Sequence, residues 1–205
     1  HNQSSRDKVE FRVNFPRKES PVLYDPMQDR YYQYEDSIVM EPWESLFVIF
    51  GTDEKPKTSR KRYYTEEKPL CDTFAISIAT AEEYPVFRET DFHRLDNLAL
   101  PDKLPTFSGT VRYSGTFSYQ GKDALSLRLE AYEIVQIWIN GRDMGVRICP
   151  PYRYDIPADL LIQGENQIDI EVTNTLVKAQ PPPWYDRFFA QEPTGLIGIY
   201  YGRSY

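Results

Sequence analysis

The sequence has few of the residues on which several kinds of protein chemistry depend. Its 205 residues include only two cysteines, Cys71 and Cys149, and two histidines. The cysteines lie far apart and form no CxxC motif, so the sequence supports neither a metal knuckle nor a thioredoxin-type redox pair. The sequence leaves open whether a disulfide joins them, because a bridge depends on their separation in the fold.

Basic charge and long apolar runs are also scarce. The formal net charge is −7, which argues against nucleic acid as a partner because that affinity rests on clustered Lys and Arg. The one basic run, SRKRYY at 59–64, is followed by Glu66 and Glu67, so we interpret it as a solvated loop. No stretch reaches the roughly 20 apolar residues of a membrane helix, so we expect no membrane partner.

The chain begins HNQSSRDK, with no apolar signal-peptide region and with His in place of Met. We therefore expect a mature product or an excised fragment, whose export signal has been removed or was never present.

Aromatic and turn-forming residues, in contrast, are plentiful. There are 16 tyrosines and 16 prolines but few long helical periodicities, and aromatic residues suit a pleated, half-buried surface. From residue 107 onward, short apolar segments alternate with turn signals such as QGKD, NGRD and QGEN. This spacing predicts an all-β fold, a sandwich or barrel and not an α/β protein.

The N-terminal half predicts further strands and one boundary. VEFRVNF (9–15) alternates apolar with polar residues, and YDPMQDRYYQYE (24–35) indicates a hairpin with an Asp-Pro-led turn. Residues 52–68 are charged and hold no apolar period, as a linker would. TFAISIATA (73–81) predicts a strand, and 82–106 predicts an irregular connection over the surface.

The segment 134–156, IVQIWINGRDMGVRICPPYRYDI, predicts a hairpin. One face of its first strand is wholly apolar and carries Val135, Ile137 and Ile139. Asn140-Gly141 then predicts a tight turn, because this dipeptide tolerates positive φ at both central positions. We expect Trp138, among apolar strand residues, to pack against the sheet.

In NQIDIEVTN (166–174) the apolar residues share one face, and Asp169, Glu171 and Thr173 share the other. This alternation predicts a strand with one buried face and one wet face.

These motifs carry a family resemblance. The stretch YEIVQIWINGRDMGVRICPPYRYDIPADLLIQGENQIDIEVTNTL resembles the sugar-binding domain of glycoside hydrolase family 2 and of large α-L-rhamnosidase-like enzymes. The signature of that domain is W-[VI]-N-G, D-x-G, P-Y-x-[FY]-D-I, G-E-N and V-T-N in this order. The matching positions are Trp138, Ile139, Asn140, Gly141, Asp143, Gly145, Pro151, Tyr152, Tyr154, Asp155, Ile156, Gly164, Glu165, Asn166, Val172, Thr173 and Asn174.

The resemblance extends upstream and implies an organisation. SIVMEPWESLFVIF (37–50) resembles the end of the small β region that precedes this domain in the rhamnosidase-like enzymes. Residues 1–51 would then be the tail of a preceding β module, 52–106 a linker and connecting strand, and 107–205 a galactose-binding-like jelly roll. The resemblance further implies a C-terminal fragment of a larger enzyme, with its catalytic domain as partner and an extracellular or periplasmic location.

We assign no catalytic residue, cofactor or metal. Glycoside hydrolysis needs two carboxyl groups roughly 5 to 9 Å apart, but we expect Asp143 and Asp155 to hold turns. His93 lies in a charged loop, where we expect it to be exposed, and no GxSxG, Walker A or GxGxxG motif occurs. Jelly rolls of this type often hold a structural calcium ion, yet no EF-hand spacing is present.

Two loops carry aromatic residues that could stack on sugar rings, Tyr152 with Arg153 and Trp184 with Tyr185. The alternative is that these loops are packed down by their own aromatics. The resemblance therefore implies a non-catalytic accessory domain of a glycoside hydrolase, and the two loops leave open whether it also contacts an oligosaccharide. An autonomous carbohydrate-binding module and a small complete glycosidase are the alternatives.

Overall fold

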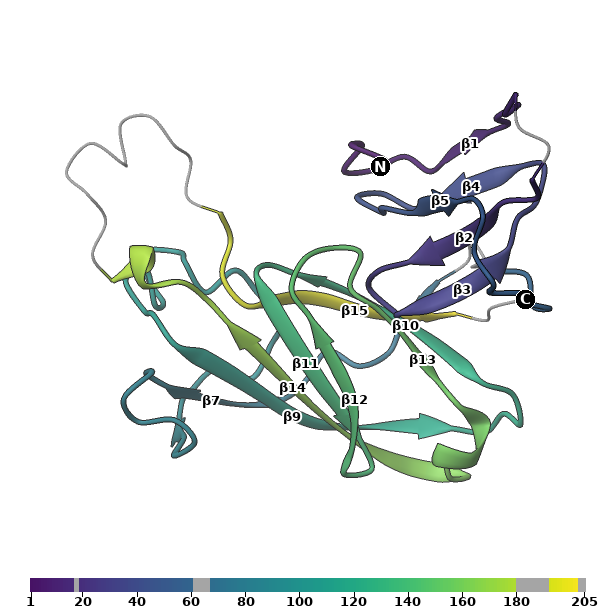
Figure 1. Ribbon diagram of the computed structural model, residues 1–205. Helices are drawn as coiled ribbons and strands as arrows, with labels where there is room; N and C mark the ends of the chain where they lie inside the picture. Colours follow the sequence, from purple (N-terminus) through teal and green to yellow (C-terminus); the bar gives the residue numbers. More distant parts are fainter. Residues whose placement is uncertain (17–18, 61–66, 180–191, 203–205) are drawn as a thin grey trace. The chain divides into compact units, whose positions relative to one another are not determined.

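The computed structural model describes residues 1–16, 19–60, 67–179 and 192–202 (Figure 1). The fold is all-β, as predicted, and the chain divides into two compact units, residues 1–63 and residues 64–203. We call them the N-terminal unit and the sandwich unit.

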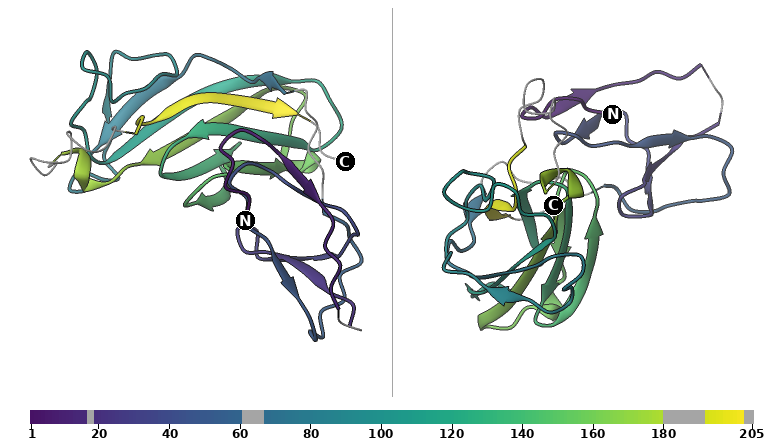
Figure 2. Two further views of the ribbon diagram at one scale, coloured as in Figure 1. Left: turned by 90° about the horizontal axis from the view of Figure 1, so that it is seen from above. Right: turned by 90° about the vertical axis from the view of Figure 1, so that its left-hand side faces the viewer.

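The sandwich unit consists of two antiparallel sheets in two layers (Figures 1 and 2). The four-stranded sheet has the order β13 (Arg153–Ile156), β10 (Leu125–Ala131), β15 (Leu196–Gly202), β6 (Lys68–Pro69). The six-stranded sheet has the order β12 (Arg142–Arg147), β11 (Ile134–Ile139), β14 (Gly164–Thr173), β9 (Thr110–Tyr119), β7 (Ala75–Ala79), β8 (Arg88–Glu89). Two short 3₁₀ helices, η1 (Ala158–Leu160) and η2 (Leu176–Lys178), flank β14. The predicted sandwich is therefore confirmed.

The hydrophobic core lies between the two sheets and follows the alternation of the sequence. On β11 every second residue is buried, and on β14 the residues Ile168, Ile170 and Val172 are buried. The four-stranded sheet contributes Leu125, Leu127 and Leu129 from β10, among others. Because side chains of a strand point alternately to its two faces, each sheet needs only one apolar face to close this core.

The predicted hairpin turn at Asn140-Gly141 is confirmed. It joins β11 to β12 through these two residues alone, with φ of 50° at Asn140 and 79° at Gly141. Positive φ at both central positions is the geometry of the tight turn that matches the twist of the flanking strands.

The N-terminal unit contains two small sheets. β1 (Val9–Phe11) pairs with β4 (Ile38–Met40), and β2 (Val22–Asp25) lies between β3 (Arg30–Gln33) and β5 (Phe47–Ile49). The predicted Asp-Pro-led turn joins β2 to β3, and Asp25 Oδ1 accepts the N–H groups of Met27 and Gln28 at 2.9 and 3.2 Å. The small core of this unit is formed by Leu23, Tyr32, Ile38 and Met40.

The units do not follow the divisions expected from the sequence. Segment 52–60 is tied to the N-terminal unit, where the Thr58 carbonyl accepts the Gln33 N–H at 3.0 Å. β6, β7 and β8, which fall in the expected linker and connection, all pair within the sandwich. Strand pairing between distant segments is not encoded in local composition, and this explains the difference.

Candidate functional site

The asparagines of the sequence signature hold loops together. Asn140 Nδ2 donates to the Leu160 carbonyl and to Asn166 Oδ1, both at 2.9 Å, and Asn140 Oδ1 accepts the Gln167 N–H at 2.9 Å. Asn166 is buried, and its Oδ1 also accepts the Ile162 N–H at 2.9 Å. These signature residues thus connect the β11–β12 turn to the start of β14, which is a structural role.

The aspartates of the signature fall in two different settings. Asp143 lies in strand β12, where its Oδ1 accepts the Gly145 N–H at 2.7 Å; this is a side-chain-to-backbone bond of the expected kind, but it is not in the hairpin turn. Asp155 lies within strand β13 and not in a turn, which corrects the sequence expectation.

The ring of Tyr152 is not accessible for stacking on a sugar. Its side chain is part of the sandwich core, with 4% of its surface exposed, and its hydroxyl donates to the Glu133 carbonyl at 2.6 Å. Burial raises the pKa of the Tyr152 phenol well above its ordinary value. Tyr152, Tyr154 and Ile156 are buried and alternate with the less buried Arg153 and Asp155. Extending the alternation of β13 back to Tyr152 would therefore have predicted that this side chain is buried.

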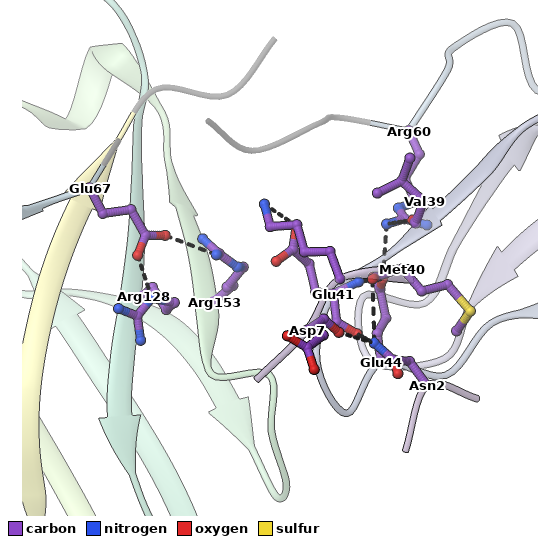
Figure 3. A network of polar contacts seen from close by, with 11 residues as sticks. Asn2, Asp7, Val39, Met40, Glu41, Glu44, Arg60, Glu67, Arg128 and Arg153 are labelled. Carbon is purple, nitrogen blue, oxygen red and sulfur yellow. Dashed lines mark hydrogen bonds and ion pairs between the residues drawn. The ribbon is translucent and has the colours of Figure 1, made fainter. Parts of the chain in front are cut away.

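Arg153 belongs to a polar cluster on the outer face of the four-stranded sheet (Figure 3). Glu67 accepts from two arginines, Arg128 Nε at 2.5 Å and Arg153 NH2 at 2.9 Å. Arg128 also pairs with Glu130 at 3.0 Å, and its guanidinium lies over the Tyr200 ring, 4.4 Å from the centroid. Arg153 is therefore engaged within the protein, where it holds Glu67, the residue directly before β6.

Trp184 and Tyr185 lie outside the described residues. Their suggested role as a sugar platform stays a prediction.

A second polar network lies within the N-terminal unit (Figure 3). Arg60 NH2 donates to the Val39 carbonyl at 2.7 Å and to Glu44 Oε2 at 2.9 Å, and the same carboxylate oxygen accepts the Glu41 N–H at 2.8 Å. Burial raises the pKa of the Glu44 carboxyl, and the Arg60 charge partly offsets this shift. This network fixes segment 41–44 to segment 58–60.

The outer face of the six-stranded sheet carries an ordered row of polar and aromatic side chains. Trp138 on β11 pairs directly with Asp143 on β12 and with Asp169 on β14, and Asp169 pairs in turn with Ser114 on β9. Directly opposed residues point to the same face of a sheet. Trp138 is half-buried there, and the sequence alone did not reveal the two aspartates beside it.

The neighbouring row contains an ion pair. Arg112 donates to Glu171 Oε1 from Nε at 3.0 Å and from NH2 at 2.6 Å, and the Tyr84 hydroxyl donates to Glu171 Oε2 at 3.2 Å. The Arg112 guanidinium also lies 3.9 Å from the centroid of the Phe87 ring. Glu171 is only 5% exposed. The expectation of a wet face is therefore wrong at this position, because Arg112 and Tyr84 cover the carboxylate.

Other candidate groups are isolated. His93 is exposed, as expected, and its carbonyl accepts the Phe74 N–H at 2.9 Å. Cys71 is half-buried and Cys149 is exposed, and both are free thiols. Within the described residues, no three His, Cys, Asp or Glu side chains are grouped as metal ligands. No helix in the described part of the chain is long and apolar enough to span a membrane.

The structural neighbours of the chain are glycoside hydrolases. A rhamnosidase from Novosphingobium sp. PP1Y is similar with a TM-score of 0.62 and 24% identity, over 95% of this chain and 21% of that chain. An FMN-binding β-glucuronidase from Facaelibacterium prausnitzii L2-6 reaches a TM-score of 0.42 at 15% identity, over 66% of this chain and 22% of that one. A β-D-glucuronidase from Dictyoglomus thermophilum reaches a TM-score of 0.42 at 17% identity, over 69% of this chain and 29% of that one.

The rhamnosidase likeness concerns the fold, and the glucuronidase likenesses are too weak to carry an argument. The chain spans about a fifth of the rhamnosidase chain. No protein-family model matches the chain, and no curated protein matches it.

Proposed function

We propose that this chain is a non-catalytic accessory β-sandwich module of a larger, rhamnosidase-like glycoside hydrolase, with a galactose-binding-like jelly roll in its C-terminal part. The observation that carries the proposal is the difference between the share of this chain and the share of the rhamnosidase chain that the structural match takes in. The fold likeness takes in 95% of this chain but only 21% of the rhamnosidase chain. A module that accounts for a fifth of an enzyme leaves ample chain for a separate catalytic domain.

The contacts of the acidic residues support a non-catalytic role. A glycosidase places two carboxyl groups across a sugar, one of which donates a proton. Here Glu44, Glu67 and Glu171 are bound to arginines, and Asp143 is bound to the Gly145 N–H. These carboxylates are taken up by contacts within the protein, which leaves them poorly placed to transfer a proton to a substrate.

The sequence signature supports the assignment to this class of module. Its residues recur in order between Trp138 and Asn174. Within this stretch, Asn140 and Asn166 join the β11–β12 turn to the start of β14. The module would support the catalytic domain, and the parent enzyme would act outside the cytoplasm, in the extracellular space or the periplasm.

The test is an assay of the chain with 4-nitrophenyl α-L-rhamnoside and related aryl glycosides. We expect no turnover above the rate of the uncatalysed reaction. A rate that saturates with substrate would contradict the proposal and favour a small complete glycosidase.

The parent enzyme provides the second arm of the test. We expect the reading frame that encodes this chain to encode a catalytic domain as well. Deleting residues 1–205 from that enzyme should lower its yield of soluble, active protein. An equal yield and equal kcat would speak against a supporting role.

An autonomous carbohydrate-binding module is the alternative, and the predicted platform of Trp184 and Tyr185 is the feature that favours it. If these rings bind sugar, Trp184→Ala abolishes tryptophan quenching by oligosaccharides and leaves the Tm nearly unchanged. If they only pack a loop, the same change costs about 3 to 5 kcal/mol of stability.

A further inference from the structure

Trp43 occupies a turn position that disfavours tryptophan. Residues 41–44 form a β-turn in which the Glu44 N–H donates to the Glu41 carbonyl at 3.2 Å. Pro42 holds the second position, and Trp43, in the third, has a φ of 62°. This is the pattern of a type II turn, whose third position normally takes glycine or asparagine. A bulky side chain there is strained, and such strain concentrates at functional positions.

Buried polar groups hold the turn in place (Figure 3). The Trp43 N–H donates to the Ser4 carbonyl at 3.2 Å, and the Glu44 carbonyl accepts the Asn2 N–H at 2.8 Å. Asn2 Nδ2 donates to the Glu41 carbonyl at 2.9 Å, and Glu44 Oε2 accepts the Glu41 N–H at 2.8 Å. The turn is therefore fixed before any partner binds, so a contact made by Trp43 loses little conformational entropy.

The turn presents its indole without unpaired charge beside it. Trp43 is 42% exposed, whereas Glu41 and Glu44 are buried. Glu41 pairs with Lys8 and Glu44 pairs with Arg60, each at 2.9 Å. An apolar ring between neutralised carboxylates is complementary to an uncharged, apolar pocket. Tryptophan is also among the residues that most often dominate the energy of a protein interface.

The core of the N-terminal unit is open next to this turn. Val9 and Phe11 of β1 lie directly opposite Met40 and Ile38 of β4, so they point to the same face as these core residues. Met40 and Ile38 are buried, whereas Val9 and Phe11 are each more than one third exposed. Met40 directly precedes the turn. The open part of the core therefore begins beside it.

The size of this surface indicates a partner on the same polypeptide. Trp43, Val9 and Phe11 together expose at most about 300 Å² of side-chain surface, since even a large aromatic side chain has only about 250 Å² to bury. A stable complex of separate proteins buries about 800 Å² on each side. A tethered partner needs far less, because the linkage raises its effective concentration. The surface therefore suits a linked domain and not a second copy of the chain.

We infer that Trp43 docks the N-terminal unit into an apolar, uncharged pocket of the catalytic domain carried by the same polypeptide. The indole fills the pocket, and the surface around it covers Val9 and Phe11. The identity of this partner rests on the proposed function. The strained turn, its fixed backbone and the open core beside it are independent of that proposal.

Hydroxyl-radical footprinting with mass spectrometry tests the docking, with an added reporter peptide to normalise the radical dose. Trp43 should be oxidised readily in the isolated chain. In the parent enzyme its oxidation should be about tenfold slower, since the centre of an interface excludes water. Equal oxidation in both proteins overturns the inference. Slow oxidation already in the isolated chain also overturns it, because the pocket would then belong to this chain.

A variant shows whether Trp43 causes the docking. Trp43→Asn removes the ring and keeps a residue that the turn accepts. In the parent enzyme it should raise the oxidation of Phe11 to the level of the isolated chain. Phe47→Ala, which removes another exposed ring of the same unit, is the matched control and should leave Phe11 protected.

Two results with Trp43→Asn contradict a docking role. Phe11 that stays protected in the parent enzyme overturns it directly. A rise of Phe11 oxidation in the isolated chain overturns it as well, because Trp43 would then serve the packing of its own unit.

A second copy is the competing occupant. Sedimentation velocity of the isolated chain should show a monomer, and a dimer that Trp43→Asn dissociates overturns the assignment to a linked domain. A reading frame without a catalytic domain contradicts the proposed function, and this inference falls with it. An unprotected Trp43 in a parent enzyme that has such a domain contradicts this inference alone.

Discussion

Arginines neutralise several of the buried carboxylates of this chain. Arg60 pairs with Glu44 in the N-terminal unit, and Arg112 pairs with Glu171 in the sandwich unit. In such pairs the desolvation cost of each charge is offset by its partner, so the loss of one partner leaves a charge buried without compensation.

Removing Arg60 should therefore destabilise the chain in a pH-dependent way. Burial raises the pKa of Glu44, and the loss of Arg60 raises it further. A carboxyl with a raised folded-state pKa binds more protons when folded, so stability falls as the pH rises from the unfolded pKa through the folded one. We expect Arg60→Ala to cost about 3 kcal/mol at pH 7 and less at pH 4 in urea unfolding.

Two variants control for this effect. Arg88→Ala breaks an exposed ion pair with Glu83, which solvent screens, and should change the stability far less than Arg60→Ala does. Glu44→Gln in the Arg60→Ala background should restore part of the loss at pH 7. An Arg60→Ala cost that does not change with pH would exclude Glu44 as its cause.

The two thiols should differ in reactivity. Burial, with a smaller effect of Asp72, raises the pKa of Cys71 to about 11, whereas Cys149 is exposed. At pH 8 only about one Cys71 side chain in a thousand is the reactive thiolate. Ellman's reagent should show one fast and one slow thiol, and Cys149→Ser should remove the fast phase. Equal rates would be inconsistent with the burial of Cys71.

Among the elements, the β11–β12 hairpin depends most clearly on one residue. Gly141 has a φ of 79°, and a Cβ at this position would meet no atom within 4 Å. The penalty for a side chain is therefore backbone strain alone. Gly141→Val should lower the free energy of unfolding by about 1 kcal/mol or more, measured by thermal or urea denaturation.

Gly141→Asn is the matched control, because asparagine tolerates this backbone region better than any β-branched residue. It should cost clearly less than Gly141→Val. Equal losses in the two variants would show that the site is limited by space and not by φ.

The same elements show what the sequence could predict. Alternation on β11 and β14 and the Asn-Gly turn were sufficient to predict a hairpin and a buried face, since both depend on neighbours within a few residues. The burial of Glu171 was not predictable, because Arg112 and Tyr84 reach it from 59 and 87 residues away. The aspartate row beside Trp138 was missed for the same reason, since strand register is a property of the folded sheet.

The whole molecule has two hydrophobic cores of unequal size. Among the described residues, 23 buried side chains form the core of the sandwich unit, and four form that of the N-terminal unit. Since stability grows with the apolar area removed from water, the larger core should be self-sufficient and the smaller one marginal.

Fragments corresponding to the units test this difference. Residues 64–203 expressed alone should give a β-type circular dichroism spectrum and a cooperative thermal transition. Residues 1–63 alone should unfold in a broad transition or be largely unfolded at 25 °C. A sharp, cooperative transition of fragment 1–63 would show that a four-residue core suffices.

The position of β15 between β10 and β6 has a consequence for protein synthesis. A nascent chain on the ribosome that has exposed everything up to β14 still lacks the strand that fills the four-stranded sheet. Until residues 196–202 leave the exit tunnel, both neighbouring strands present unpaired backbone groups, which favour pairing with other chains. The sandwich unit is therefore expected to fold only after residues 196–202 have emerged, and a product truncated before β15 should need chaperones and aggregate without them.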